Sequence, residues 1–328
     1  MAADDVARIP PVFEAYADET LAQAPAAGPG KNGLLEATFA RSGDNPTRLI
    51  RDRVEVPYHL TGTLDTDPAP GLVALIAQEP TGGVAQGDRH RLRIDARTDA
   101  RAHVTTQSAT KVHSMGANYA HLDASLAAAQ GSYLEYVPGP TIINEDARCL
   151  QTVSVDLADG AVVVVADVLV PDGLSDHEPF SFDHYHARVE AEHDGRLICA
   201  DAVDLRPDER DPRDPASVGE YGVVGSLYVF APGRHADRKR GGSNGSDEAD
   251  GDRDDVSTLV SAVHDRLSTA ESEEGDVEAG VSMLPYESGA VVRLLGHREA
   301  DVTHALRRAW DQTRQHFLGV GVPADRRY

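Results

Sequence analysis

The sequence predicts a mainly β protein: a β-rich sandwich or layered body of many short strands, with two α-helices near the C-terminal third. Short segments that alternate apolar and polar residues, or are continuously apolar, recur through residues 33–231. Helical periodicity is confined to two segments after residue 255, apart from a possible short helix near residues 119–129. Many strands followed by two helices favour a β body with helices packed on it.

Each strand prediction depends on a local pattern. The segment RHRLRIDAR (89–97) alternates apolar and polar residues, as a half-buried strand does. In QTVSVDLADGAVVVVADVLV (151–170) two such runs flank Asp159-Gly160, and this predicts a β-hairpin. A second hairpin is predicted around Asp194-Gly195.

Two helices are predicted from apolar residues spaced three and four apart. Asp255 is expected to cap the first helix, and Asp301 to cap the second, which Gly319 would end in a left-handed conformation. One or two strands are expected between the helices, in residues 280–296. The apolar faces consist of Val256, Leu259, Val260, Val263 and Leu267 in the first helix, and Val302, Leu306, Ala309, Trp310 and Phe317 in the second.

Composition also suggests the domain organisation. Residues 1–30 are rich in Ala, Pro and acidic side chains and predict a flexible N-terminal tail. Residues 31–328 are expected to form a single domain, with a disordered acidic insertion at about 233–255. The insertion contains GGSNG, but a nucleophilic serine needs a strand before it and a helix after it, and Ser243 has neither pattern beside it.

The charge balance limits the partners. The 328-residue chain has 31 basic and 54 acidic side chains, a formal charge of −23, and only three lysines. Such a surface repels nucleic acid and anionic membranes. Together with the depletion of lysine, it predicts a cytoplasmic protein of a salt-accumulating halophile, because molar salt screens the repulsion over about 3 Å. No apolar run long enough for a membrane helix and no secretory signal are present.

One segment offers candidate metal ligands. In SDHEPFSFDHYH (175–186), His184 and His186 are two residues apart, so on a strand both would point to one face. Imidazole is a common ligand of divalent transition metals. His177, Glu178 and Asp183 would add further ligands, although surface histidines without a metal show the same pattern. Cys149 and Cys199 have no metal-ligand spacing and are expected to be buried thiols.

Three other stretches stand out locally. The glycines of GGVAQGD (82–88) predict positive φ or close backbone approach, with Asp88 capping, turning or binding a cation. TTQSATKV (105–112) resembles a polar edge strand with Gln107 and Lys111 on one face. Glu135 lies between two residues expected to face the core, and would face outward or line a groove.

In order and spacing, these stretches resemble the UreD family of urease accessory proteins, also called UreH. The resemblance covers roughly residues 33–328, and its most specific part is the Thr-Thr-Gln-x-Ala-Thr-Lys-Val block. The other matches are Gly-Gly-x-x-x-Gly-Asp, Leu-Glu-Tyr-x-Pro, Thr-Ile, Ala-Arg, Glu-x-Phe, Val-Arg-Leu-Leu-Gly and the final tryptophan helix. The matching residues are Gly82, Gly83, Gly87, Asp88, Thr105, Thr106, Gln107, Ala109, Thr110, Lys111, Val112, Leu134, Glu135, Tyr136, Pro138, Thr141, Ile142, Ala147, Arg148, Glu178, Phe180, 292–296, Trp310, Leu318 and Gly319.

The chain departs from the family pattern at three places. His113 and Ser114 replace the aromatic and basic residues common after Lys-Val. Gly139-Pro140 replaces a Gln-Glu pair, so an acidic side chain is missing there. His177 stands where a glycine usually precedes the glutamate.

The resemblance implies a non-catalytic maturation factor with a mostly β fold. It would bind the urease structural subunits and the accessory proteins UreF and UreG, a GTPase that carries nickel. It would hold no tightly bound cofactor but pass Ni²⁺ through an internal passage. The matched carboxylates Asp88, Glu135 and Glu178 are candidate residues of the nickel path. The glycine turn and the threonine block (Gly82, Gly83, Gly87, Asp88, Thr105, Thr106, Gln107, Thr110, Lys111) are the candidate partner-binding or structural motif.

Two alternatives remain open. The chain could be a metal-dependent hydrolase that uses His177, Asp183, His184 and His186, which predicts one bound metal and intrinsic activity. It could also be a structural β protein whose motifs are only turns and edges, which predicts neither activity nor partner complexes.

Overall fold

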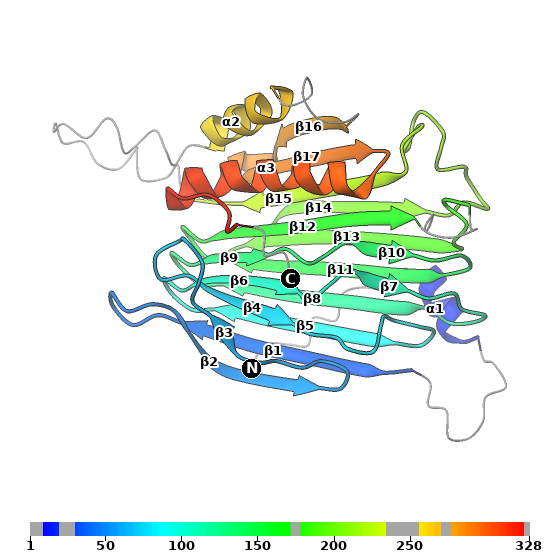
Figure 1. The fold of residues 1–328 in the computed structure, drawn as a ribbon, viewed down its shortest axis with the longest axis horizontal. Coiled ribbons are helices and arrows are strands. Elements are labelled where there is room, and N and C mark those ends of the chain that lie inside the picture. The colour runs from blue at the N-terminus through cyan, green and yellow to red at the C-terminus, as the bar shows by residue number, and fades with distance from the viewer. Residues whose placement is uncertain (1–8, 20–29, 172–177, 234–255, 270–276, 325–328) are drawn as a thin grey trace.

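The structure, a computed structural model, consists of two β-sheets that pack face to face, and it describes residues 9–19, 30–171, 178–233, 256–269 and 277–324 (Figure 1). The first sheet has seven strands, in the spatial order β14 (Arg196–Leu205), β13 (His184–His193), β11 (Arg148–Leu157), β8 (Ala120–Ala128), β5 (Arg89–Ala96), β1 (Asn32–Ala40) and β2 (Arg48–Glu55). The second has ten, in the order β16 (Val277–Met283), β17 (Gly289–Gly296), β15 (Val223–Phe230), β12 (Val162–Pro171), β9 (Tyr133–Tyr136), β6 (Arg101–Thr106), β4 (Val73–Ala77) and β3 (Thr63–Leu64), with β7 (Thr110–Val112) and β10 (Thr141–Ile143) joined beside β12. The mainly β prediction is confirmed.

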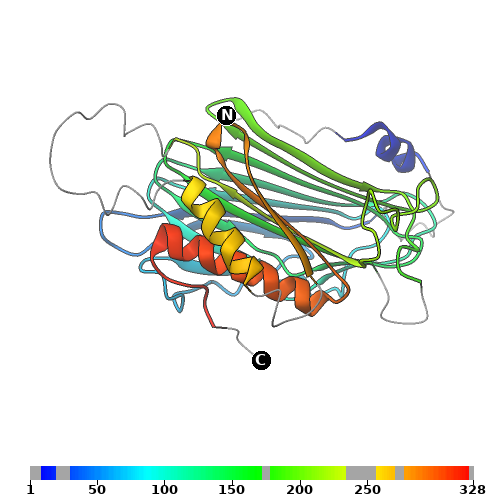
Figure 2. The ribbon, with the colours of Figure 1, turned by 90° about the horizontal axis from the view of Figure 1, so that it is seen from above.

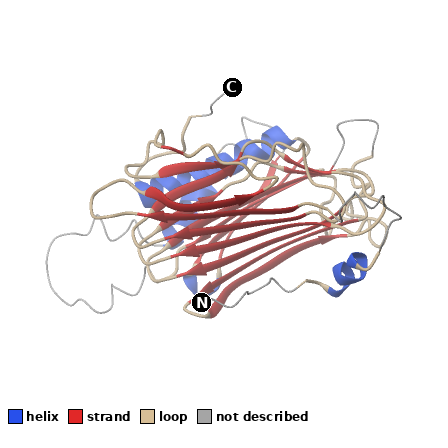
Figure 3. Ribbon diagram, turned by 90° about the horizontal axis from the view of Figure 1, so that it is seen from below, coloured by secondary structure: helices blue, strands red, loops and turns tan. Residues whose placement is uncertain are grey.

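The middle of the chain winds back and forth between the two sheets. β5, β8, β11 and β13 belong to the first sheet, and β6, β9 and β12 between them belong to the second. Within each sheet these strands pair in parallel with the strand of the neighbouring turn. Each turn of this coil therefore adds one strand to each layer, and the layers run along the length of the body (Figure 3).

This winding corrects one of the two predicted hairpins. β11 and β12 flank Asp159-Gly160 but lie in different sheets, whereas β13 and β14 flank Asp194-Gly195 and pair antiparallel, as predicted. The physical difference is in the turn: a two-residue type I′ hairpin needs positive φ at both central residues. Asp194 (φ 50°) and Gly195 (φ 73°) both satisfy this, whereas at the first site only Gly160 has positive φ.

Two further local predictions are wrong. Residues 120–128 form strand β8 and not a helix. The strand pairs in parallel with β5 on one side and with β11 on the other, so its backbone hydrogen bonds are made within the sheet. TTQSATKV is not one strand either: β6 ends at Thr106 and β7 begins at Thr110, so Gln107 and Lys111 do not share a strand.

Apolar side chains between the sheets form the main core. Leu35, Phe39, Ile94, Val104 and Val163 are each at most 2% exposed and come from both sheets. Burying apolar surface contributes roughly 25 cal/mol per Å² removed from water, so this layer is the main source of stability. Cys149 and Cys199 are free thiols, both buried, as predicted.

Helices α2 (Val256–Ser268) and α3 (Glu299–Leu318) cover the outer face of the second sheet near β15 and β17 (Figures 1 and 2). Both predicted helices are confirmed, with their apolar faces buried in a second core. Gly319 (φ 69°) ends α3 in the left-handed conformation, as expected. Asp301 does not cap α3: the cap is Arg298, without a side-chain hydrogen bond, and Asp301 lies in the first turn. Asp255 and Ser243 lie outside the described residues, as does the insertion from residue 234 onward.

A short helix, α1 (Pro11–Ala17), lies at the right-hand end of the body in Figure 1, away from α2. It falls within the segment expected to be a flexible tail. Its Phe13 is fully buried against Tyr119 and Leu150 of the body. This part of the predicted tail is therefore folded onto the first sheet. None of the helices in the described part of the chain is long and apolar enough to cross a membrane.

Gly225 sets how closely α3 approaches the second sheet. A Cβ at this position of β15 would lie 2.7 Å from Val302 Cγ1 of α3 and 3.2 Å from Leu294 Cβ of β17. In the same sheet, a Cβ at Gly280 of β16 would meet nothing within 4 Å. Neither glycine has positive φ, so a substitution at either position tests packing alone.

We predict that Gly225→Ala lowers the free energy of unfolding by about 1–3 kcal/mol, the usual cost of overpacking a core. Gly280→Ala, the matched control, should change it little. Both variants are to be compared with the wild type by denaturant unfolding at constant molar KCl. An equal, small effect of the two substitutions would show that the α3 contact is not tight.

Candidate functional site

A buried carboxylate connects α3 to the second sheet. Glu135 of β9 is 0% exposed and accepts hydrogen bonds from Tyr133 Oη (2.8 Å), Trp310 Nε1 (2.8 Å) and His103 Nδ1 (2.9 Å). Arg314 Nε of α3 lies 3.2 Å from the same carboxylate. Burying a carboxylate is costly unless charged and hydrogen-bonding partners surround it, and here both are present.

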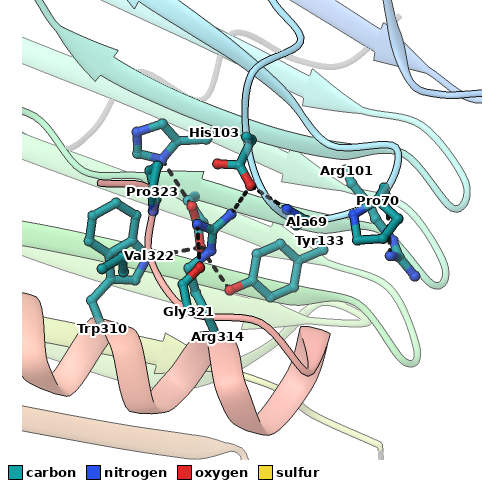
Figure 4. Close-up of polar contacts among 12 residues, drawn as sticks. Ala69, Pro70, Arg101, His103, Tyr133, Trp310, Arg314, Gly321, Val322 and Pro323 are labelled. Atoms are coloured by element: carbon teal, nitrogen blue, oxygen red, sulfur yellow. Dashed lines mark hydrogen bonds and ion pairs between the residues drawn. The ribbon is translucent and has the colours of Figure 1, made fainter. Parts of the chain in front are cut away.

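Arg314 extends this cluster toward the C-terminus (Figure 4). Its guanidinium is fully buried, donates to Asp67 Oδ1 (2.6 Å) and to the carbonyl of Gly321 (3.2 Å), and so ties α3 to the segment before β4 and to the chain after α3. Trp310 stacks on the ring of His103, with 5.2 Å between ring centroids. We call Asp67, His103, Tyr133, Glu135, Trp310 and Arg314 the Glu135 cluster.

The environment favours the charged form of Glu135. Burial alone would raise its pKa, but the hydrogen bond and charge of His103, the charge of Arg314 and the Trp310 hydrogen bond together lower it. Burial alone would lower the pKa of Arg314, but the charge of Glu135 and the hydrogen bond and charge of Asp67 raise it above its ordinary value. The pair is therefore ionised at neutral pH.

The sequence analysis expected Glu135 to face outward or to line a groove, whereas the structure buries it completely. Its neighbours on the strand, Leu134 and Tyr136, do alternate with it, but α3 covers the face on which Glu135 lies. Both faces of β9 are thus buried, one by the first sheet and one by the helix.

The glycine turn is held together by Asp88. Its carboxylate, 3% exposed, accepts from the backbone N–H groups of Lys31 (2.7 Å) and Ala85 (2.9 Å) and lies 3.1 Å from the Lys31 ammonium. That ammonium also donates to the Gly83 carbonyl (2.9 Å). Capping, turning and cation binding were the roles expected of Asp88. Its carboxylate stabilises the turn through the two backbone N–H groups, and the cation that it binds is the Lys31 ammonium.

The glycines behave as the sequence predicted. Gly82, Gly83 and Gly87 have φ of 84°, 130° and 77°. A Cβ on Gly83 would lie 2.4 Å from the Lys111 carbonyl oxygen, because Val84 N–H donates to that carbonyl at 2.8 Å. The glycine turn and the threonine block, about twenty residues apart in sequence, therefore lie side by side.

Within the threonine block the hydroxyls bind backbone. Thr105 Oγ1 donates to the Val137 carbonyl (2.7 Å), and Thr106 Oγ1 accepts from the Gly139 N–H (2.8 Å). Thr110 is joined through its N–H to the Pro140 carbonyl (2.8 Å). Gln107 and Lys111 are exposed, so a partner could reach their side chains.

A third polar group lies inside the body, between the two sheets. Asp167 of β12 accepts from Gln151 Nε2 of β11 (2.9 Å) and from Tyr185 Oη of β13 (3.2 Å). Burial raises the pKa of Asp167, more than the Gln151 and Tyr185 hydrogen bonds and the charge of Arg293 lower it. This carboxyl is thus unusual in the body, because its surroundings do not fully compensate its charge.

The polar group continues toward the edge of the sandwich. Arg293 of β17 contacts Asp201 of β14 and Ser226 of β15, and Tyr228 Oη donates to Asp201 (3.0 Å). A cavity of about 10 Å³, enough for about one water molecule, is lined by Gln151, Asp167, Ser226, Tyr228 and Arg293 among others. We call Gln151, Asp167, Tyr185, Asp201, Ser226, Tyr228 and Arg293 the interior polar group.

The sequence analysis missed the interior polar group. One signal was present: Asp167 stands in the continuous apolar run VVVVADVLV, where a charged residue is rare unless it is paired or functional. The hydrogen-bond partners of Asp167 could not be found this way, because they come from two other strands, β11 and β13.

The structure brings only two of the candidate metal residues together. His184 and His186 lie on one face of β13, as predicted, and Asp204 of β14 joins them, with His184 Nε2 2.6 Å and His186 Nδ1 3.5 Å from Asp204 Oδ1. Asp183 instead pairs with Arg148 Nε at 2.8 Å. His177 lies outside the described residues.

The three expected nickel-path carboxylates are not brought together. Asp88 lies in the turn before β5, Glu135 lies under α3, and Glu178 lies exposed in the segment before β13. In the described part of the chain, no hydrogen bond or ion pair joins any two of them. Glu178 has no place in either buried cluster.

The fold and these clusters define a two-sheet β protein that holds several polar clusters in its interior. A family model described as UreD urease accessory protein matches residues 31–327. The chain belongs to this family and thus has a role in urease maturation.

Relatives agree with this assignment. The chain is 63% identical to the urease accessory protein UreD of Natronomonas pharaonis, over 98% of this chain and 99% of the relative. It is 52% identical to UreD of Haloquadratum walsbyi, over 96% and 95%, and 29% identical to UreD of Photorhabdus laumondii, over 90% and 85%. The first two come from halophilic archaea, which fits the interpretation of the acidic, lysine-poor composition.

We predict that Glu135→Gln lowers the free energy of unfolding at neutral pH by about 3 kcal/mol, because it leaves a buried guanidinium with one acidic partner fewer. Glu278→Gln, at an exposed position of β16 in the same sheet, is the control and should have little effect. Denaturant unfolding at constant salt measures both.

The effect of Glu135→Gln should depend on pH with a defined sign. The folded-state pKa of Glu135 is depressed, so its stabilising contribution is present above the ordinary pKa of a glutamate, about 4.3. It is lost as the pH falls below that value toward the folded-state pKa. The gap between wild type and variant should therefore shrink in acid; a gap that widens in acid would contradict the ionised cluster.

Proposed function

We propose that this chain is a non-catalytic maturation factor that binds apo-urease together with the accessory proteins UreF and UreG and assists delivery of nickel to the urease active site. Its work would take place in the cytoplasm. The observation that carries the proposal is the interior polar group, which places the Asp167 carboxylate beside other oxygen-bearing side chains and Arg293 around a small cavity between the two sheets.

The chemistry of this group suits an ion in transit. Carboxylate, amide and phenol oxygens bind Ni²⁺ less strongly than imidazole or thiolate sets do, so a metal can enter and leave. The Cys149 thiol, whose pKa the charge of Asp167 also influences, is not activated to bind a metal, because burial raises its pKa far above the ordinary thiol value. Ni²⁺ is here a cargo that passes the group and not a resident cofactor.

Asp167 is the residue we assign to the nickel path. Its raised pKa reflects a carboxylate that its surroundings compensate only in part. A passing dication would supply the missing compensation, and the proton would leave as the metal binds. Strained or uncompensated groups that persist in a stable interior are a reason to suspect function.

The carboxylates matched to the family motif keep their place in the proposal, with different expected roles. Asp88 and Glu135 are already saturated by internal donors, so their effect on nickel would pass through the shape of the glycine turn and the position of α3. Glu178 is exposed and is the one of the three that a partner or a hydrated ion can reach.

The hydrolase alternative has less support. Two of its four residues, His184 and His186, lie together, but Asp183 is paired with Arg148. Among the described residues the third potential ligand beside the two histidines is Asp204 and not Asp183. We therefore assign no catalytic residues.

The test is Asp167→Asn in cells that co-express the urease subunits and the accessory proteins. We expect the nickel content of the purified urease to fall by about tenfold, comparable with the loss of a supporting group at a metal site. Asp156→Asn, at an exposed position of the adjacent strand β11, is the control and should leave the nickel content unchanged.

The free energy of unfolding of Asp167→Asn should not fall with the nickel content. Because the folded-state pKa of Asp167 is raised, its contribution to stability is present below the ordinary pKa and is lost as the pH rises through the raised value. At neutral pH, Asp167→Asn should thus be at least as stable as the wild type in denaturant unfolding. Normal nickel content in the urease made with a stable Asp167→Asn variant would contradict the assignment.

A further inference from the structure

Three potential metal ligands meet on the outer face of the first sheet. His184 and His186 project from β13 on the face opposite to Tyr185, whose hydroxyl reaches Asp167 in the interior. Asp204 faces them from β14, and one nitrogen or oxygen of each residue lies within 4.8 Å of the others. This group is therefore separate from the interior polar group.

The present contacts of His184 cannot all be satisfied at once. Its Nε2 lies 2.6 Å from a carboxylate oxygen of Asp204, which requires that nitrogen to donate. The same Nε2 lies 3.3 Å from Nε of Arg206, which is itself a donor and requires the nitrogen to accept. His184 is fully buried, and neither its Nδ1 nor Nε2 of His186 has a hydrogen-bond partner among the residues that the structure describes.

We propose that His184, His186 and Asp204 bind a divalent transition-metal ion such as Ni²⁺ or Zn²⁺. Two imidazoles and one carboxylate are a common protein ligand set for such ions, with open positions left for water. The separations of 2.6 and 3.5 Å lie on either side of the roughly 3 Å spacing between ligand atoms that are each bound about 2.0–2.2 Å from one metal. Small side-chain movements are thus enough to admit the ion.

The metal takes the place of a cation that is already there. Arg206 contacts both His184 and Asp204, and it also contacts Glu209 at 3.2 Å. It can keep the Glu209 contact when it leaves the site. The dication then provides the positive charge that Arg206 supplied to Asp204. It also accepts the lone pair of His184 Nε2, which removes the conflict between the Asp204 acceptor and the Arg206 donor at that nitrogen.

Helix α1 covers this site. The ring of Phe13 lies 4.4 Å from that of His184 and 6.1 Å from that of His186, measured between centroids. The cover shields the imidazoles on one side, while Asp204 is 39% exposed and leaves an entry for the ion. A second group, Asp159, His193 and Asp194, is more exposed and has one imidazole only, so it is the weaker candidate.

The test is equilibrium dialysis of the purified full chain against NiCl₂ in molar KCl, which suppresses unspecific binding to the acidic surface. We expect one Ni²⁺ per chain, bound at least about tenfold more weakly by His186→Ala and by Asp204→Asn. The controls are His264→Ala, at an exposed position of α2, and Asp156→Asn, at an exposed position of β11; both should bind as the wild type does. Fully buried His184 is left intact, because its replacement risks the fold.

Cobalt gives a second readout. Co²⁺ bound to the wild type should show the visible absorption bands of a nitrogen-ligated site. The His186→Ala variant should lose these bands while its unfolding midpoint stays the same. The proposal is overturned if the wild type binds no Ni²⁺ above the level of its variants, or if either variant keeps the wild-type affinity. Because this test uses the chain alone, its outcome is distinct from that of the urease nickel measurement.

Discussion

The buried carboxylate of Glu135 is the constraint on which the helical side of the molecule depends. Four groups converge on it from three parts of the chain: His103 from β6, Tyr133 from β9 itself, and Trp310 and Arg314 from α3. Each partner helps to keep the buried carboxylate ionised. If one were removed, water could not reach the site to replace the lost hydrogen bond or charge. The cluster therefore fixes the rotation and height of α3 over the sheet, and through Asp67 and Gly321 also the chain that follows.

The two polar clusters differ in how completely they are satisfied, and this difference suggests different uses. In the Glu135 cluster, hydrogen bonds and ion pairs lower the pKa of the carboxylate, as expected of a structural ion pair. In the interior polar group, burial outweighs the hydrogen bonds to Asp167, and its pKa is raised. A buried acid whose charge is poorly compensated adds little to the stability of the fold at neutral pH. Its presence in the core therefore supports the proposed role in moving a cation.

Strand β13 shows how one strand can serve two surfaces. Side chains alternate between its faces, so Tyr185 lies in the interior while His184 and His186 point outward. The inner face belongs to the proposed nickel path, and the outer face to the proposed metal site under α1. Both depend on the coil-like winding, which places β11, β13 and β14 next to each other although β12 separates β11 from β13 in the chain.

The sequence by itself determined the mainly β class, the strands on either side of both Asp-Gly turns, both C-terminal helices, the second hairpin and the conformations of the glycine turn. These features follow from local periodicity and from residues such as Gly83 and Gly319 that tolerate positive φ. It also predicted that His184 and His186 share a face, because alternation along one strand is local. Only the tertiary structure decided that β11 and β12 part into different sheets, that Glu135 is buried, and that Asp167 and Asp204 find their partners. Those outcomes depend on which strand or helix covers a given face, and the contacts that decide this come from residues far apart in the chain.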